Sequence, residues 1–337
     1  MPSCLITGAS GFVGSNLARI ARDAGWRVRG LIRSASNADE LERLHVELVF
    51  GSLDDEASLA AAVHGVDVVF HIAGRTKALR REEFARDNVE GTRRVAQACA
   101  AQSPPPVLVM TSSLAAGGPG TFAQPRRETD AAEPVSHYGR SKLEAERELA
   151  AVADRVPASV VRPPIVFGPG DRASLQMFRG MKFLPLHPTP GFRRWPVSVV
   201  YVDDLCRGLI EIALRGERAP KSDAGAASGE GVYYIAAERN VTYGEFGRLA
   251  GAAAGWLVVP VPLFVAAFWG VGAMGEAIGR LRSRPCLINL DKARETSARG
   301  WVCDDAKLRN QLDYRPTGSL EEQLATTVAW YRERGWL

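Results

Sequence analysis

The chain has 337 residues, of which 46% are hydrophobic and 24% are charged, a composition typical of a globular protein and not of a disordered one. Its formal net charge of +4 is small for this length, and its basic pairs are scattered, so we expect no nucleic-acid partner. Five widely spaced cysteines without a CxxC pair argue against a zinc site and a disulfide framework, and they favour a reducing cytoplasm. We expect no bound metal.

The first motif is an apolar run at residues 4–7 that breaks into glycines and then continues with helical spacing. This pattern predicts a strand, a tight turn and a helix. Gly8 lets the chain leave the strand sharply, Gly11 lets the backbone approach a pyrophosphate, and Gly14 lets the helix pack closely. The helix N-terminus then faces the phosphates of a dinucleotide. A glycine triplet alone is weak evidence, because glycines also form ordinary turns. The run is not a signal peptide, since it lacks a basic flank and is interrupted by glycines.

Strands and helices alternate after this turn. Apolar runs predict strands at 27–32, 47–50, 66–74 and 107–110, and segments with helical spacing predict helices at 37–44 and 83–101. The run at 66–74 is nearly all apolar, which suits a parallel strand buried on both faces, and we interpret His71 within it as a core histidine. The alternation predicts an α/β fold with a doubly wound parallel sheet, whose ligands lie at the carboxyl ends of the strands.

Polar residues at these strand ends are the candidate catalytic groups. Ser112 and Ser113 follow the strand at 107–110, and Tyr138 and Lys142 are four residues apart in a predicted helix, so they share one face. An ammonium beside a phenol stabilises the phenolate and lowers the pKa of the phenol. Alone, the pair is better explained as a surface tyrosine and a solvated lysine on an amphipathic helix. The glycine turn and the serines favour a site for proton exchange.

Seven phrases together carry a resemblance to a known family. They are TGASGFVG at 7–14, VDVVFHIAG at 66–74, NVEGT at 88–92, TSS at 111–113, YGRSK at 138–142, VVRPPIVFGPGD at 160–171 and VYVDDL at 200–205. Over nearly its whole length the chain resembles the extended short-chain dehydrogenase/reductase family, also called the NAD-dependent epimerase/dehydratase family, and within it the dihydroflavonol reductase and 3-beta-hydroxysteroid dehydrogenase branches. The resemblance implies a Rossmann-type sheet with a smaller, discontinuous C-terminal substrate lobe.

The same resemblance assigns roles to four residues. Tyr138 is implied as the general acid/base, and Lys142 as the group that lowers its pKa and holds the nicotinamide ribose. A serine is implied to bond the substrate oxygen, with Ser113 favoured over Ser112. Asn88 is implied to support the lysine and a proton path.

The implied cofactor is NADP, with NAD left open. In NAD users the second strand usually ends in an acid that binds the ribose, whereas Ile32 stands here and is followed by Arg33, which suits a 2'-phosphate. After the third strand, Ser52 stands in place of the aspartate that usually contacts the adenine of the cofactor, which leaves Leu53 as the residue expected to contact the adenine ring. The implied cofactor-binding residues are Gly8, Gly11, Phe12, Val13, Gly14, Arg33, Ser52, Leu53, Ala73, Gly74, Tyr138, Lys142, Pro163 and Val166.

The sequence favours an NADP-dependent oxidoreductase that interconverts a ketone and a secondary alcohol on a mostly apolar substrate. A nucleotide-sugar epimerase or dehydratase is the first alternative, but Val197 stands where we expect the arginine of those enzymes, and Arg193 and Arg194 can replace that arginine only if their loop shifts. A noncatalytic NADPH sensor is the second alternative. The presence of Ser113, Tyr138 and Lys142 argues against it, because a sensor does not need an acid beside the nicotinamide.

The second lobe is expected from residues 171–197 and 219–300, with a surface loop at 216–231. Residues 1–170, completed by about 198–216, form the expected Rossmann domain, and 301–337 form a C-terminal segment and helix. The stretch Leu257–Met274 carries no charge, and its two prolines argue against a membrane span, so it predicts a buried or interfacial helix. We expect it to line the pocket of a lipophilic substrate or to rest on a membrane, with core packing as the rival. A homodimer is left open.

Overall fold

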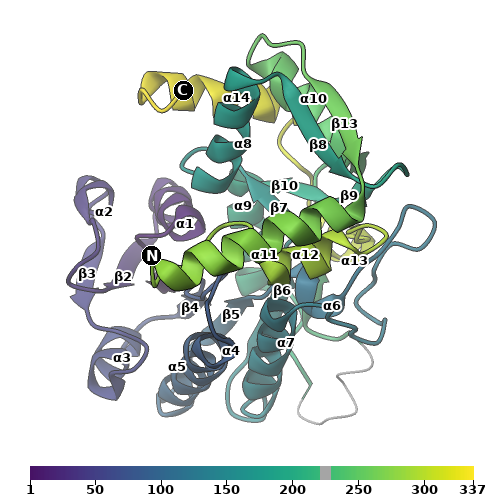
Figure 1. The fold of residues 1–337 in the computed structure, drawn as a ribbon. Helices are drawn as coiled ribbons and strands as arrows, with labels where there is room; N and C mark the ends of the chain where they lie inside the picture. The colour runs from purple at the N-terminus through teal and green to yellow at the C-terminus, as the bar shows by residue number, and fades with distance from the viewer. Residues whose placement is uncertain (221–228) are drawn as a thin grey trace.

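A computed structural model of the chain describes residues 1–220 and 229–337. The centre of the structure is a seven-stranded parallel sheet in the order β11-β6-β5-β4-β1-β2-β3. Its strands are β1 (Ser3–Thr7), β2 (Arg27–Ile32), β3 (Glu47–Phe50), β4 (Val68–His71), β5 (Val107–Thr111), β6 (Ala158–Arg162) and β11 (Val232–Tyr234). The order reverses between β1 and β4, so their carboxyl ends form the crevice where ligands bind in such sheets. The predicted α/β class and Rossmann-type fold are confirmed (Figure 1).

Helices cover both faces of the sheet, which explains why its central strands are apolar throughout. One core joins the first face to α1 (Phe12–Asp23), α2 (Asp39–Arg43), α9 (Val202–Arg215) and α13 (Ala306–Leu312). The other core joins the second face to α3 (Glu56–Val63), α5 (Gly91–Ala100) and α7 (His137–Ala150). Within β1, Cys4 and Ile6 belong to the first core and Leu5 to the second, as the two-residue period of a strand requires.

The helix expected at 83–101 is interrupted. The structure has α4 (Arg81–Phe84), then a π-helical turn η1 (Ala85–Glu90), then α5. Such turns insert an extra residue and are frequent at functional sites. Here the turn holds Asn88, whose side chain is buried at the carboxyl edge of the sheet. The sequence pattern could not show this interruption, because the apolar spacing runs on through it.

A smaller lobe is built around a second core from segments that are far apart in sequence. Three two-stranded sheets belong to this region: β7 (Ile165–Phe167) with β10 (Val199–Tyr201), β9 (Pro196–Val197) with β12 (Val241–Thr242), and β8 (Leu186–Pro190) with β13 (Val259–Leu263). Its helices are α8 (Arg172–Phe183), α10 (Tyr243–Ala253), α11 (Val265–Leu281), α12 (Leu290–Thr296) and α14 (Leu320–Glu333), and the short α6 (Leu114–Gly117) follows β5. Of the loop expected at 216–231, residues 221–228 lie outside the described part of the chain.

The prediction of a single helix at Leu257–Met274 is wrong. Its first part forms strand β13, whose prolines fit because it pairs only with β8, and the helix α11 begins at Val265 and continues to Leu281. The stretch is also not buried: Leu257, Phe264 and Met274 are all largely exposed. Among the described residues, no helix has the length and apolar character needed to cross a membrane.

Candidate active site

The glycine turn after β1 has the geometry expected from its sequence. Gly8 has a φ of 71°, and its carbonyl accepts a hydrogen bond from the Gly11 N–H at 2.9 Å. A Cβ on Gly14 would lie 2.1 Å from the Gly8 oxygen, and one on Gly8 would lie 2.9 Å from the backbone of Ala73. Because no side chain fits at either position, the turn stays narrow and the first turn of α1 faces the crevice with no acidic residue in it.

Tyr138 lies in the first turn of α7, beyond the end of β5. Burial raises the pKa of Tyr138 above its ordinary value, while hydrogen bonding with the Ser113 side chain and the positive charge of Lys292 lower it. The ring also packs at 6.1 Å from that of Phe84 in α4. A phenol with a raised pKa is protonated at neutral pH, so it can act as a proton donor towards a group held between it and Ser113.

The structure separates the roles of the two adjacent serines. Ser112 is buried, and its hydroxyl donates to Glu146. Glu146 in turn pairs with Arg162, whose Nη2 lies 2.6 Å from Oε2. Ser113 instead caps α6, accepting from the Ala115 N–H at 3.1 Å, and interacts with Tyr138. The arrangement therefore supports Ser113 as the serine that faces a substrate.

Lys142 is buried one turn along α7 from Tyr138. Its Nζ donates to the carbonyl of Thr111 at 2.7 Å, and burial lowers its pKa to about 8. A Cβ on Gly74 would lie 3.5 Å from this ammonium and 3.2 Å from Asn88 Oδ1, so these three residues meet. Asn88 accepts from the Arg75 N–H at 2.7 Å and donates to Ser141 Oγ at 2.9 Å. The sequence-predicted catalytic residues thus come together at the carboxyl ends of β4 and β5.

His71 is a satisfied core residue. Its Nδ1 lies 2.8 Å from Thr7 Oγ1 and its Nε2 lies 2.9 Å from Thr92 Oγ1. Burial lowers its pKa to about 3, so the ring is neutral. The described residues hold no group of three histidine, cysteine or acidic side chains suited to a metal ion.

Sequence reasoning missed the contribution of α12. Asp291 accepts from the backbone N–H groups of His137 and Tyr138 at 2.7 and 3.0 Å, and Glu295 accepts from the hydroxyl of Ser136 at 2.8 Å. Both carboxylates stabilise the positive N-terminus of α7. No sequence signal could reveal this contact, because α12 lies more than 150 residues away along the chain.

Lys292 lies on the same helix and adds a second cation to the site. Its Nζ is 2.6 Å from Glu295 Oε2, and half of its side chain is exposed. The charges of Glu295, Tyr138 and Asp291 raise the pKa of Lys292 although burial opposes this, so it stays positively charged at neutral pH. The positive charge of Lys292 is thus one influence that lowers the Tyr138 pKa, in addition to the role that the family resemblance implies for Lys142.

Aromatic side chains of the smaller lobe complete the surroundings. Tyr243, at the start of α10, lies close enough to Lys292 for the lysine charge to lower its pKa, although burial raises it overall. Its ring packs edge-on against Trp195 at 5.6 Å and lies 4.5 Å from the ring of His187. Burial lowers the pKa of His187 to about 4, so this ring is uncharged too. These aromatic side chains, which we call the aromatic wall, therefore lie near Lys292 in the smaller lobe.

The other predicted cofactor residues lie along one path across the carboxyl edge of the sheet. They are Phe12 and Val13 at the start of α1, Arg33 after β2, Ser52 and Leu53 after β3, Ala73 and Gly74 after β4, Pro163 after β6 and Val166 in β7. Ser52 accepts from the Asp54 N–H at 3.2 Å and so shapes its own turn. The Arg33 guanidinium is exposed and makes no hydrogen bond or ion pair within the described part of the chain. This group lies at the edge of the sheet remote from Tyr138.

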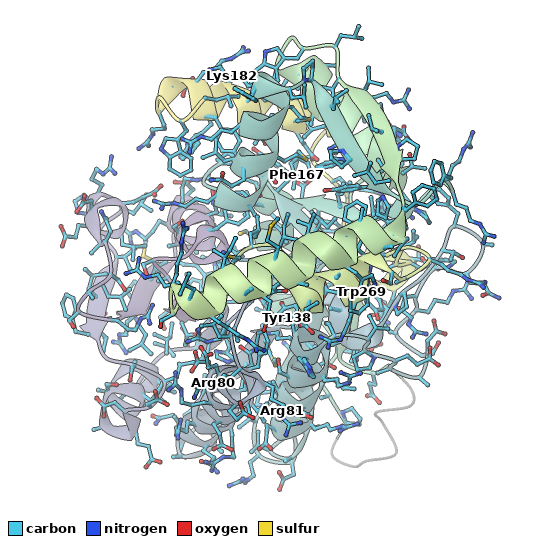
Figure 2. All side chains as sticks on the ribbon, viewed as in Figure 1. Arg80, Arg81, Tyr138, Phe167, Lys182 and Trp269 are labelled. Atoms are coloured by element: carbon cyan, nitrogen blue, oxygen red, sulfur yellow. The ribbon has the colours of Figure 1, made fainter. Side chains whose placement is uncertain are left out.

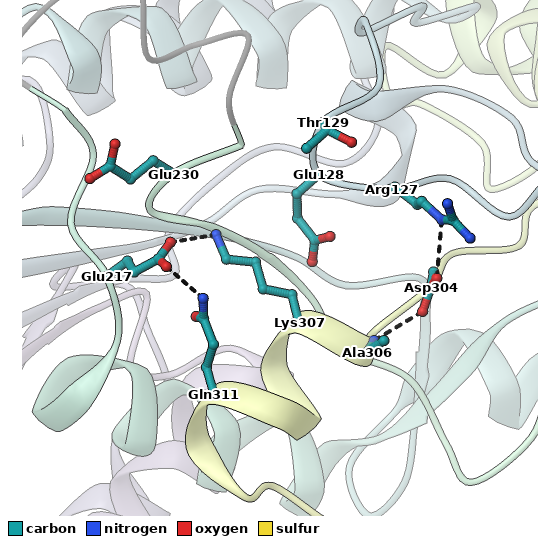
Figure 3. A pocket seen from close by; sticks show the side chains of 9 residues that line it. All are labelled: Arg127, Glu128, Thr129, Glu217, Glu230, Asp304, Ala306, Lys307 and Gln311. Atoms are coloured by element: carbon teal, nitrogen blue, oxygen red, sulfur yellow. Dashed lines mark hydrogen bonds and ion pairs between the residues drawn. The ribbon is translucent and has the colours of Figure 1, made fainter.

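Two cavities accompany this site. One of about 210 Å³ is adjacent to Tyr138, between residues 78–84, His137, α11 and residues 289–294. A larger one of about 530 Å³ contains none of the predicted catalytic or cofactor residues, and its charges are mostly paired: Lys307 lies 2.7 Å from Glu217, and Arg127 lies 3.2 Å from Asp304 (Figure 3). No predicted catalytic or cofactor residue lines either cavity, but the smaller one includes His137, which adjoins Tyr138, so we place the candidate site at the crevice at Tyr138.

Comparisons with known proteins agree with this geometry. Residues 4–224 match the family described as the NAD dependent epimerase/dehydratase family. The chain is 30% identical to a protein of Caulobacter vibrioides named ceramide reductase, over 98% of this chain and 95% of the relative. It is 28% identical to a putative dihydroflavonol 4-reductase of Synechocystis sp., over 100% and 97% of the two chains. The crystal structure of gox2253 covers both chains completely, with a TM-score of 0.78 and 25% identity.

The family match covers more than half of the chain, and the first relative aligns along nearly all of it. The chain therefore belongs to the NAD-dependent epimerase/dehydratase family and is an NAD(P)-dependent oxidoreductase of the extended short-chain dehydrogenase/reductase type.

Proposed function

We propose that this enzyme uses NADP(H) to interconvert a ketone and a secondary alcohol on a lipophilic substrate. The observation that carries the proposal is the pairing of Ser113 with Tyr138, with the aromatic side chains of Trp195 and Tyr243 in the adjoining lobe. Two hydroxyls converge where a carbonyl oxygen can be bound, and the facing surface offers apolar contact to the rest of the molecule.

The residues at the crevice fit a dinucleotide. Gly8 and Gly14 are positions where a Cβ would collide with backbone, so the turn stays tight and the α1 N-terminus faces the crevice, where it can receive a pyrophosphate. Arg33 supplies unpaired donors at the end of β2, where a 2'-phosphate would lie, and this supports NADP over NAD. When bound, the cofactor supplies or accepts the hydride.

Each of the chain's own residues then has a defined task. Ser113 donates a hydrogen bond that polarises the substrate carbonyl, and Tyr138 gives its phenolic proton to the oxygen as the carbon is reduced. The phenolate that remains is stabilised by the positive charge of Lys292, and Lys142 holds the ribose through its ammonium. In the direction of alcohol oxidation, Tyr138 takes the proton back.

A lipophilic substrate is supported by what the lobe presents to the site. Val197 is fully buried in β9, and the arginine expected there in nucleotide-sugar enzymes is absent. A diphosphate needs charged or backbone donors, whereas the wall is aromatic. The relative named ceramide reductase makes a long-chain lipid ketone the first substrate class to test.

The test is NADPH oxidation with ketones that range from short alkyl chains to long-chain acyl and steroid ketones. Replacing Tyr138→Phe removes the proton donor but keeps the ring, so we expect the rate to fall about 100-fold or more with little change in NADPH affinity. The control Tyr243→Phe removes a phenol from the same wall and should retain most of the rate. Near-native turnover by the Tyr138→Phe variant would contradict the assignment.

A second measurement separates the epimerase alternative. Calorimetry with UDP-glucose and dTDP-glucose should show no binding in the micromolar range, because no arginine fork is available at Val197. Micromolar binding of either nucleotide sugar would replace the proposed reaction with the epimerase or dehydratase class.

A further inference from the structure

Helix α11 has an unusual distribution of side chains, because its smallest residues face inward. A Cβ on Gly275 would lie 2.0 Å from the Ile288 carbonyl oxygen, and one on Gly272 would lie 2.9 Å from the Asn289 oxygen. A Cβ on Gly279 would lie 3.1 Å from the Arg284 carbonyl oxygen, in the segment that follows the helix. With spacing of three and four residues, these glycines form one stripe that packs directly on the chain at 284–293. The helix is therefore fixed in place by backbone contact and not by burying its large side chains.

The large side chains of α11 point outward instead. Phe264, Val271, Met274, Ile278 and Leu281 share one face of the helix, since they follow each other at intervals of three, four or seven residues. Their exposed fractions run from 38% for Ile278 to 88% for Leu281. In a helix that packs by its apolar face these residues would be inside. Helix α11, which carries this apolar stripe, crosses the front of the molecule in Figure 1, where it is seen along its full length.

Phe192 extends the stripe at its N-terminal end. Its ring meets that of Phe264 edge-on at 4.9 Å, and both rings remain about two-thirds exposed. We call the six residues Phe192, Phe264, Val271, Met274, Ile278 and Leu281 the docking face. Clustered exposed aromatic and aliphatic groups of this kind mark interaction surfaces in monomeric proteins.

The segments that form the docking face are basic. Residues 191–194 and 264–284 carry five basic residues and one acidic residue, a net charge of +4. The one acid, Glu276, has 16% of its side chain exposed and is paired with Arg280 at 3.2 Å. Exposed arginines therefore flank both ends of the face: Arg193 and Arg194 beside Phe192, and Arg282 and Arg284 after Leu281.

We propose that the docking face lies in the surface of an anionic lipid bilayer. The apolar stripe would enter the boundary between headgroups and acyl chains, while the flanking arginines contact lipid phosphates. The helix would lie in the plane of the membrane, consistent with the finding that no described helix could cross it. A second copy of the chain fits less well, because a twofold contact between two such faces would leave the arginines of both copies without carboxylates.

The position of α11 connects this surface with the active site. Glu276 and Arg280 of α11 line the 210 Å³ cavity together with His137, the neighbour of Tyr138. Tyr138 and the helix are seen together in Figure 2. Helix α11 thus carries both the docking face and one wall of a cavity that reaches the residue next to Tyr138. Delivery of a lipid substrate from the membrane would rest on the proposed function, whereas membrane binding itself does not.

The test is flotation with vesicles of phosphatidylcholine alone and of phosphatidylcholine with 30% phosphatidylglycerol. We expect the native protein to float with the anionic vesicles, and the pair Phe192→Ser with Phe264→Ser to lose at least tenfold in bound fraction. Replacing Arg282→Ala and Arg284→Ala should weaken binding to anionic vesicles only. Phe50→Ser, which removes an equally exposed ring from the edge strand β3, is the matched control and should float like the native protein.

The outcomes separate the competing explanations. Native protein that floats with neither kind of vesicle overturns the proposal. The proposal also fails if the double Phe192→Ser, Phe264→Ser variant binds vesicles like the native protein and differs only in having lost a dimer, as measured by light scattering. Equal melting temperatures of the variants and the native protein establish that a loss of binding is not unfolding. The Tyr138→Phe variant should float normally, so an error in the proposed reaction would leave the membrane result unchanged.

Discussion

The buried pair between Glu146 of α7 and Arg162 of β6 offers a quantitative test of how the site is supported. Glu146 Oε2 accepts from Nη2 at 2.6 Å and Oε1 accepts from Nε at 3.0 Å, while the Ser112 hydroxyl donates to the same carboxylate. The Arg162 Nη1 also donates to the hydroxyl of Tyr234 at 3.2 Å. Both charged side chains are less than a tenth exposed, so neither can be solvated by water if the other is lost.

We expect Glu146→Gln to lower the free energy of unfolding by about 3–5 kcal/mol, because it leaves the Arg162 charge buried without a counterion. The same substitution also removes the charged acceptor of the Ser112 hydroxyl, and the range of free energies already includes this weakened hydrogen bond. Against a total stability of about 5–15 kcal/mol, this is a large fraction. The double replacement Glu146→Leu with Arg162→Met should be less destabilising than either single loss of charge, since it removes both charges from the interior.

Urea unfolding followed by circular dichroism and by tryptophan fluorescence gives the measurement, and coincident curves establish two-state behaviour. The control is Glu144→Gln, an exposed carboxylate on the same helix, which should change stability by no more than about 0.5 kcal/mol. A Glu146→Gln variant within about 1 kcal/mol of the native protein would refute the reasoning.

Three further predictions concern charge in the site. Arg33→Ala should weaken the affinity for NADPH about tenfold or more and leave the affinity for NADH nearly unchanged, because a charge-assisted hydrogen bond contributes about 1.5–3 kcal/mol. Equal affinity of the native protein for the two cofactors would disprove the NADP preference. Burial lowers the pKa of Lys142 from its ordinary value of 10.5 to about 8. Between these two pH values the unfolded chain holds a proton that the folded chain has released, so the free energy of unfolding rises with pH. Lys142→Met should therefore raise the free energy of unfolding at pH 7 by about 1–3 kcal/mol, a gain that disappears above pH 10.5, while activity is lost; unchanged urea curves at pH 7 would contradict this. Lys292→Met should move the pH profile of alcohol oxidation to higher pH because the Tyr138 phenolate loses a cation, and Lys292→Arg should restore it; a profile that stays in place would exclude the role of Lys292.

The sequence by itself determined the features that depend on neighbours along the chain. Gly8 and Gly14 are required by a turn that a Cβ would block, and strands β2 and β3 have the bounds that the apolar pattern predicts. The spacing of Tyr138 and Lys142 put them on one face of α7 for the same reason, because a helix fixes which residues are adjacent. These local rules were sufficient for the doubly wound sheet, whereas the family followed from the resemblance of the seven motifs.

Contacts between distant segments were decided only by the tertiary structure. The neighbouring hydroxyls of Ser112 and Ser113 are chemically identical in sequence, and they differ only because Glu146 reaches one of them and Tyr138 the other. Lys292 enters the site because α12 caps α7, a contact that no local pattern encodes.

The apolar stretch at 257–274 shows the same limit. An uncharged apolar segment indicates that its side chains are covered, but it does not show whether the protein core, a ligand or a lipid covers them. In the structure the first part of this stretch forms strand β13. The glycines of α11 pack against the following segment, so the large side chains of that helix face outward. Which side of a helix is buried depends on how closely a neighbouring backbone approaches it, and that distance exists only in the folded chain.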